Sequence, residues 1–162
     1  MTVTDELIEN SRKYAQTFDK GDLALPPAKK VAVVACMDAR LIPTRVLGLN
    51  EGDAHVIRNA GGVITDDEIR SLAISQHLLG TEEVILIHHT DCGMVTFTDE
   101  QFRAKLREAS GQEPSWDPEA FSDIEENVRE SIRRIIDSPF VPHKNVRGFV
   151  FDVKDGSLRE VT

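Results

Sequence analysis

Short apolar runs that alternate with helical patterns constrain the fold of this chain more than any other feature. The first run, Val31–Ala35, holds only small or β-branched residues, which is typical of a parallel strand buried on both faces. Including this run, the predicted parallel strands are 31–35, 54–58, 84–89 and 148–153. Helical patterns lie between them, and two of these open with capping boxes, at Thr65–Glu68 and Thr98–Gln101. This alternation predicts a three-layer α/β domain with a mostly parallel sheet.

The end of the chain predicts one more strand. Asp155-Gly156 is typical of a hairpin turn, so Leu158–Val161 should return as an antiparallel edge strand. With the parallel strands in the order 2-1-3-4, we expect one domain to fill residues 1–162. No internal repeat, linker or low-complexity segment interrupts it.

Residues 1–27 precede the first strand and are expected to form an N-terminal helical arm. The pattern predicts a helix over 4–18 with Thr4 as its N-cap, ended by Gly21 and two prolines. Its apolar residues fall on one face: Leu7, Tyr14 and Phe18. That face must pack either on the chain's own sheet or on a partner subunit.

Charge and composition exclude some functions. The chain has 19 Lys and Arg against 28 Asp and Glu, a formal net charge of −9, and no basic run. Nucleic acids and anionic membranes are therefore poor partners. The first residues lack a signal-peptide pattern, and the apolar run Val84–Ile87 is too short to span a bilayer, so we expect a cytoplasmic protein. The two cysteines are then expected to be reduced and to serve metal binding or catalysis.

Reactive side chains follow two strands that should be neighbours. Cys36, Asp38 and Arg40 come directly after the first strand, and His89 and Cys92 end and follow the third. The carboxyl ends of neighbouring parallel strands meet at one edge, so two thiolates and an imidazole should converge there as a catalytic Cys₂His zinc site. Asp38 is the candidate for a fourth ligand. His88 is a weaker one, because adjacent strand residues point to opposite faces.

These residues also allow other interpretations. Buried cysteines often act as small hydrophobic residues. Thr90 and Asp91 could simply form a turn, and Arg40 could be a surface charge. A tyrosine-phosphatase loop needs an arginine where the chain has Ile42, and no Cys-x-x-Cys or glycine-rich phosphate loop is present. The remaining histidines show no matching partners and are expected to be surface or core residues: His55, His77 and His143.

Three segments together resemble the signature of the β-class carbonic anhydrases. They are Cys36-Met37-Asp38-Ala39-Arg40, Arg58-Asn59-Ala60-Gly61 and His89-Thr90-Asp91-Cys92-Gly93. The resemblance implies a zinc ion held by Cys36, His89 and Cys92. It also implies that Asp38 is either a fourth ligand or, paired with Arg40, the acceptor for zinc-bound water. An obligate homodimer is implied as well, with the N-terminal helix reaching over the neighbouring subunit.

The implied reaction is the reversible hydration of carbon dioxide to bicarbonate and a proton through a zinc-bound hydroxide. Because two thiolates cancel the formal charge of Zn²⁺, we expect a weaker Lewis acid than a three-histidine site and activity that improves at alkaline pH. One alternative on the same zinc site is a carbonyl sulfide or carbon disulfide hydrolase. A more remote alternative is a non-catalytic, zinc-stabilised binding domain. The glutamine, phenylalanine and tyrosine that line the substrate pocket of plant-type members have no assignable counterparts here.

Overall fold

A computed structural model describes residues 1–162. The strands are β1 (Val31–Cys36), β2 (Ala54–Asn59), β3 (Glu83–His89), β4 (Asn145–Phe151) and β5 (Leu158–Val161). The α-helices are α1 (Val3–Thr17), α2 (Pro43–Val46), α3 (Asp66–Leu79), α4 (Asp99–Ser110) and α5 (Ile124–Asp137). Two short 3₁₀ turns, η1 (Ala60–Gly62) and η2 (Gly93–Val95), follow β2 and β3.

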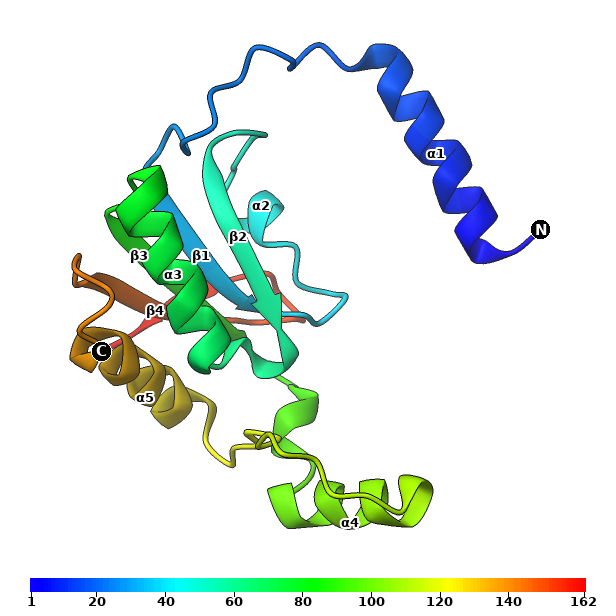
Figure 1. The fold of residues 1–162 in the computed structure, drawn as a ribbon, viewed down its shortest axis with the longest axis vertical. Coiled ribbons are helices and arrows are strands. Elements are labelled where there is room, and N and C mark those ends of the chain that lie inside the picture. Colours follow the sequence, from blue (N-terminus) through cyan, green and yellow to red (C-terminus); the bar gives the residue numbers. More distant parts are fainter.

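The five strands form one sheet in the order β2-β1-β3-β4-β5 (Figure 1). β1 pairs in parallel with β2 and β3, β3 pairs in parallel with β4, and β5 returns antiparallel to β4. Cys36 lies opposite Asn59 in this register, and Ala35 lies opposite Ile87. The predicted strand order and the antiparallel C-terminal edge are confirmed.

Both faces of the sheet are covered, which explains why every residue of β1 is buried. On one face, α3 and α5 pack on the sheet, with Leu72 and Ile135 beside Val34 in one apolar cluster. On the other face, Leu41 before α2 and Val33 of β1 belong to a second cluster, to which partly buried residues from α2 and several loops are added. The apolar runs were therefore correct indicators of strands buried on both sides.

Local signals fix the helix ends. The capping boxes at Thr65–Glu68 and Thr98–Gln101 form as predicted and open α3 and α4. Pro43 is the first residue of α2, where its missing N–H costs nothing. Gly80 ends α3 in the left-handed conformation.

The N-terminal helix begins differently from its prediction. Its capping box is formed by Thr2 with Asp5, not by Thr4, because the Asp5 carboxylate accepts from the Thr2 N–H at 2.7 Å. Of the two alternatives for its apolar face, packing on the chain's own sheet is not observed, since none of its residues is buried and the helix stands away from the sheet (Figure 1). No helix of the chain has the length and apolar character that crossing a membrane would require.

Candidate metal centre

Three potential metal ligands meet at the carboxyl ends of two neighbouring strands. Cys36 is the last residue of β1, His89 is the last residue of β3, and Cys92 lies in the loop that follows. Their ligand atoms all lie within 4.8 Å of one another, and Cys36 Sγ is 3.1 Å from His89 Nε2. All three side chains are buried, and both cysteines are free thiols. The structure thus brings these predicted ligands together.

The two consecutive histidines point to opposite faces, as strand geometry requires. His88 is turned away from the thiols, and its Nε2 lies 2.7 Å from Asn127 Oδ1 on α5. His89 faces Cys36, and its Nδ1 lies 2.7 Å from the Thr90 carbonyl oxygen. Because a carbonyl can only accept, Nδ1 carries the proton and Nε2 is left with its lone pair toward the thiols. His88 is therefore not a member of the cluster.

Asp38 lies at the rim of the cluster and is held by Arg40. Asp38 Oδ1 accepts from the backbone N–H of Arg40 at 2.8 Å and from Nε at 3.0 Å, and Oδ2 accepts from Nη2 at 2.9 Å. These hydrogen bonds keep the pKa of Asp38 well below its usual value, so the carboxylate is ionised at neutral pH. Asp38 Oδ2 is 3.7 Å from His89 Nε2, which leaves it within reach of the thiols and the imidazole.

Two further residues hold this region together, and sequence reasoning assigned neither of them. Asp91 accepts from Arg40 Nη1 at 2.8 Å, so the guanidinium joins the ends of β1 and β3. Arg58 donates from Nη2 to the backbone carbonyls of Cys36, Asp38 and Leu41 at 2.7 to 2.9 Å. The sequence indicates Arg58 and Asp91 only as members of the segments that resemble the family signature, with a turn as the other interpretation of Asp91. In the structure Asp91 lies in a bend and adopts a left-handed φ of 53°.

Gly62 allows the loop after β2 to pass directly over β1. A Cβ at this position would lie 2.9 Å from the backbone N of Cys36, and the φ of Gly62 is +69°. Both the contact and the backbone angle exclude larger residues. The loop therefore closes against the strand that carries the first thiol.

The two thiols lie close together and influence each other's ionisation. The neighbouring Cys92 thiol lowers the pKa of Cys36 to about 4, with smaller contributions from His89 and from the backbone of Asp38 and Gly61. The neighbouring Cys36, together with burial, raises the pKa of Cys92. Without a metal ion the pair thus shares one proton, and a cation that displaces this proton would leave two thiolates.

The donor set fits zinc. Two cysteine sulfurs and one histidine nitrogen form a known three-ligand catalytic set that leaves the fourth position open. Tetrahedral zinc with normal bond lengths separates such donor atoms by roughly 3.5–3.8 Å, and the three atoms here already lie within 4.8 Å of one another. The buried site therefore needs little rearrangement to hold the ion.

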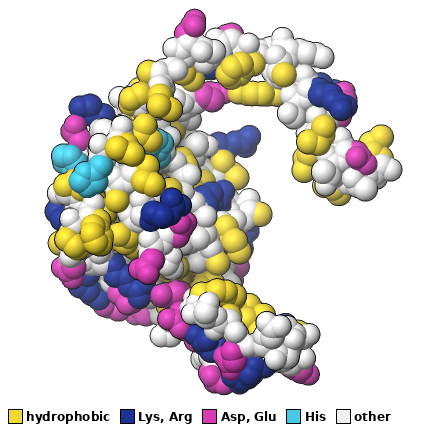
Figure 2. Space-filling model, in the orientation of Figure 1, with side chains coloured by type: hydrophobic (Ala, Val, Ile, Leu, Met, Phe, Trp, Pro, Cys, Tyr) yellow, Lys and Arg dark blue, Asp and Glu magenta, His cyan; other side chains and the backbone are white.

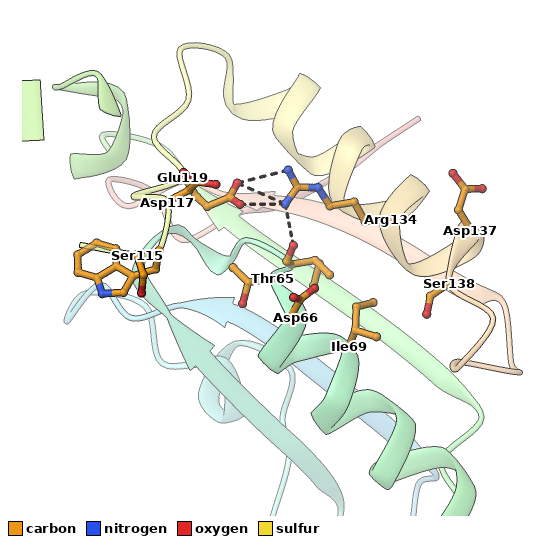
Figure 3. Close-up of a pocket in the computed structure, with 11 residues that line it drawn as sticks. Thr65, Asp66, Ile69, Ser115, Asp117, Glu119, Arg134, Asp137 and Ser138 are labelled. Carbon is orange, nitrogen blue, oxygen red and sulfur yellow. Dashed lines mark hydrogen bonds and ion pairs between the residues drawn. The ribbon is translucent and has the colours of Figure 1, made fainter. Parts of the chain in front are cut away.

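A cavity of about 310 Å³ opens onto the three ligands. Apart from the ligands and Asp38, it is lined largely by apolar side chains, including Met37, Ala60, Met94 and Phe97. A larger cavity, of about 840 Å³, lies elsewhere, between the start of α3, the end of α5 and residues 115–119 (Figure 3). It contains no thiol or imidazole, and its arginine, Arg134, is engaged by Glu119 and by the Ile64 carbonyl.

The remaining histidines lie outside the metal centre. His55 Nδ1 is 2.7 Å from the hydroxyl of Ser75, and His77 Nε2 is 3.0 Å from the Phe140 carbonyl oxygen. Neither these two nor His143 belongs to the group of potential metal ligands.

Comparison with known proteins gives consistent matches. A family model described as carbonic anhydrase matches residues 31–158. The chain is 60% identical to β-carbonic anhydrase 1 of Mycobacterium tuberculosis, over 100% of this chain and 99% of that one. It is 31% identical to a carbon disulfide hydrolase of Acidithiobacillus thiooxidans, covering 98% and 90% of the two chains. The crystal structure of a carbonic anhydrase from Streptococcus mutans superposes with a TM-score of 0.94 at 43% identity, covering 100% and 99%.

Proposed function

The chain belongs to the β-class carbonic anhydrase family, and from this premise we propose that it catalyses the reversible hydration of carbon dioxide to bicarbonate and a proton. The observation that carries the proposal is the buried Cys36, His89 and Cys92 group with the Asp38–Arg40 pair at its rim. This arrangement occurs in a chain that matches a β-carbonic anhydrase over its full length.

Cys36, His89 and Cys92 would hold the zinc ion. When bound, zinc supplies Lewis acidity that makes water acidic enough to furnish a nucleophile near neutral pH. The chain prepares its ligands for this role, since the pKa of Cys36 is already lowered and Nε2 of His89 already presents its lone pair. Burial excludes competing water from the thiols.

Asp38 orients the reacting water by accepting a hydrogen bond from it. The carboxylate is suited to this role because its pKa is lowered, so it remains an acceptor throughout the neutral range. Arg40 fixes both carboxylate oxygens with three hydrogen bonds and so sets their direction. If Asp38 turned away from Arg40, its carboxylate would instead help to hold the zinc ion as a fourth ligand, and it would then no longer be available to orient water.

The cavity beside the ligands suits a small apolar substrate. Met37, Ala60, Met94 and Phe97 offer no strong hydrogen-bonding group to a molecule in this space. Carbon dioxide has no net charge or dipole, and such a surface admits it without competing with Asp38 for the attacking water. The same surface would also admit carbonyl sulfide or carbon disulfide, so substrate preference must be measured.

We also propose that the working form is a homodimer in a reducing, cytoplasmic setting. The apolar residues of α1 and of its C-cap are exposed, with Leu7 at 59% and Phe18 at 51%, although helices of globular proteins usually bury such a face. Figure 2 shows a wide hollow between α1 and the remainder of the molecule, with hydrophobic side chains on both sides of it. A second copy would cover these surfaces. The reducing setting follows from the two free thiols that the site requires.

The direct test is stopped-flow hydration of carbon dioxide by the zinc-loaded protein, with carbonyl sulfide and carbon disulfide in parallel. We expect carbon dioxide to be the best substrate and the rate to rise between about pH 7 and about pH 9. A zinc-loaded protein without turnover on any of the three would support the non-catalytic alternative. Turnover confined to the sulfur compounds would instead identify the hydrolase.

The role of Asp38 is tested by Asp38→Asn, which keeps the shape and removes the charge. We expect kcat to fall about 10²-fold, as for loss of a positioned acid–base group, while zinc content is unchanged. Asp137→Asn, at an exposed carboxylate of the larger cavity, is the control and should retain full activity. Wild-type turnover in Asp38→Asn would rule the role out.

A further inference from the structure

Thr90 lies between two of the candidate ligands without being one itself. It directly follows His89 at the end of β3, shortly before Cys92, and its side chain is half-buried. Each of its three polar groups has a partner. The backbone N–H donates to the Phe151 carbonyl at 2.9 Å, the hydroxyl oxygen accepts from the Val153 N–H at 3.0 Å, and the carbonyl oxygen accepts from His89 Nδ1 at 2.7 Å. Thr90 therefore connects the end of β4 to a ligand.

The threonine hydroxyl takes the place of a backbone acceptor. In the parallel pairing of β3 with β4, His89 lies opposite Phe151, and the Thr90 N–H continues the ladder by donating to the Phe151 carbonyl. One more regular step would make the Thr90 carbonyl the acceptor for the Val153 N–H, because hydrogen bonds are evenly spaced along a parallel pair. That N–H donates to the hydroxyl instead. The Thr90 carbonyl is thereby left free for the histidine.

The free carbonyl fixes the imidazole of His89. A carbonyl can only accept, so the proton stays on Nδ1, and Nε2 keeps its lone pair. The same hydrogen bond limits rotation of the ring, whose Nε2 lies 3.1 Å from Cys36 Sγ. Outer-shell acceptors of this kind set the tautomer and the direction of metal-binding histidines, and their loss weakens metal affinity. The position of the Thr90 carbonyl therefore bears directly on a ligand atom.

The peptide that carries this carbonyl is held on its other side as well. Asp91 comes next, with its left-handed φ of 53°, a conformation that a residue other than glycine keeps only where its surroundings hold it. Arg40 supplies that support, since Nη2 donates to the Asp91 carbonyl at 3.0 Å and Nη1 to its carboxylate at 2.8 Å. The Thr90 hydroxyl is the corresponding support on the β4 side. Together these contacts fix the direction of the Thr90 carbonyl.

Resting on the zinc chemistry proposed above, we propose that Thr90 is a positioning residue of the metal centre. Its hydroxyl accepts from the Val153 N–H and so leaves the Thr90 carbonyl to the Nδ1–H of His89, which keeps Nε2 directed toward the thiols. This role depends on the oxygen atom of the side chain and not on its volume.

The substitution Thr90→Val tests this inference on the full-length chain, because it keeps the shape of the side chain and removes the acceptor. The Val153 N–H should then compete with His89 for the Thr90 carbonyl. We expect zinc affinity, measured by competition with a chromophoric chelator, to fall about tenfold or more, as for other outer-shell partners. In NMR spectra of the zinc-loaded protein with isotope-labelled histidine, the Nδ1–H proton of His89 should shift upfield and exchange faster with water, because its hydrogen bond is weaker. The His89 ring is identified as the one whose Nε2 signal moves when zinc binds.

Matched variants separate this effect from a packing defect. Thr90→Ser keeps the hydroxyl and should retain both the zinc affinity and the His89 signal of the wild type. Thr44→Val removes the hydroxyl of an exposed threonine in α2 and should change neither. If Thr90→Val fails to fold by circular dichroism, Thr90→Ala takes its place, because it removes the same oxygen and leaves a smaller side chain. Wild-type affinity, a loss of affinity with an unmoved His89 signal, or a Thr90→Ser variant as weak as Thr90→Val each overturns the inference.

The outcome is independent of the hydration assay. A wild-type protein that binds zinc and shows the expected changes in Thr90→Val, but does not hydrate carbon dioxide, contradicts only the proposed function. A protein that hydrates carbon dioxide, and whose Thr90→Val variant keeps its zinc affinity and its His89 signal, contradicts only the positioning role.

Discussion

The metal centre and the N-terminal arm differ strongly in how far the chain buries their side chains. At the metal centre Cys36, His89 and Cys92 are buried, and His89 is held by contacts to Cys36 Sγ and to the Thr90 carbonyl oxygen. The arm has no buried residue along α1, and Tyr14 of this helix donates one hydrogen bond to Glu51 of the body, at 3.2 Å. The candidate ligands therefore meet within a single chain, whereas the apolar face of α1 has no covering surface within that chain. Substitutions in the two regions should separate metal binding from assembly.

The largest effect is expected from Cys36→Ala. Loss of one thiolate from a three-ligand site should remove stoichiometric zinc and reduce turnover to the level of the buffer blank. Metal analysis and stopped-flow hydration measure the two consequences. His143→Ala removes an exposed histidine outside the cluster and is the control. Zinc retained at full stoichiometry in Cys36→Ala would show that the cluster is not the metal site.

Gly62→Ala should destabilise the fold by about 2–4 kcal/mol, because it adds backbone strain to a steric clash with β1. The contact responsible is the 2.9 Å approach to the backbone N of Cys36. Gly21→Ala is the matched control from the arm, where an added Cβ meets nothing within 4 Å. Urea denaturation of both variants measures the difference. Equal midpoints would mean that the loop after β2 is not fixed against the strand.

The double substitution Leu7→Ser with Phe18→Ser tests the arm. If α1 covers a second copy, losing two exposed apolar side chains should weaken the dimer by about tenfold to a hundredfold. Analytical ultracentrifugation measures the dissociation constant, and Lys13→Ser, a polar change on the same helix, is the control. Zinc content should stay at the wild-type level. An unchanged dissociation constant would contradict the proposal that α1 covers a second copy of the chain.

The smallest effect is expected from Asp91→Asn. This change weakens the outer of the two ion pairs of Arg40, in which the Asp91 side chain is 74% exposed. Exposed pairs contribute little, so kcat should fall only about twofold to fivefold and the melting temperature should hardly change. Asp38 keeps its own three hydrogen bonds to Arg40. A loss as large as that of Asp38→Asn would mean that the outer pair, not the inner one, orients the carboxylate.

Most of the fold could be predicted because its signals are local. Apolar runs identified the four parallel strands, and the Asp155-Gly156 turn signal identified β5. Thr65, Thr98 and Gly80 mark helix ends by chemistry that depends only on near neighbours. The start of α1 was harder to predict, since Thr2 and Thr4 are both plausible N-caps. Thr2 is the N-cap because Asp5, three residues later, completes a capping box with it. No local signal in the sequence indicates where the apolar face of α1 packs, and the structure shows only that this face is not covered by the chain itself.

The candidate ligands could be predicted because thiols and imidazoles are rare and their strands are neighbours. The supporting role of Arg58 could not, because its contacts are to the backbone. Arg58 donates to three carbonyls, and carbonyls carry no residue-type signature. The ion pair of Asp91 with Arg40 joins residues that are 51 positions apart, so no local pattern indicates it. Such contacts depend on the folded path of the loops.

The short antiparallel strand β5 has a consequence for aggregation. An exposed edge strand can pair with strands of other chains, and proteins prevent this with short edge strands and charged side chains. β5 has four residues, and two of them are engaged in ion pairs: Glu160 with Arg147, and Arg159 with Glu125. An incoming strand would have to disrupt these pairs to add at this side. The other edge of the sheet is β2, which has no partner strand on its outer side, so an added strand is expected at that edge rather than beside β5.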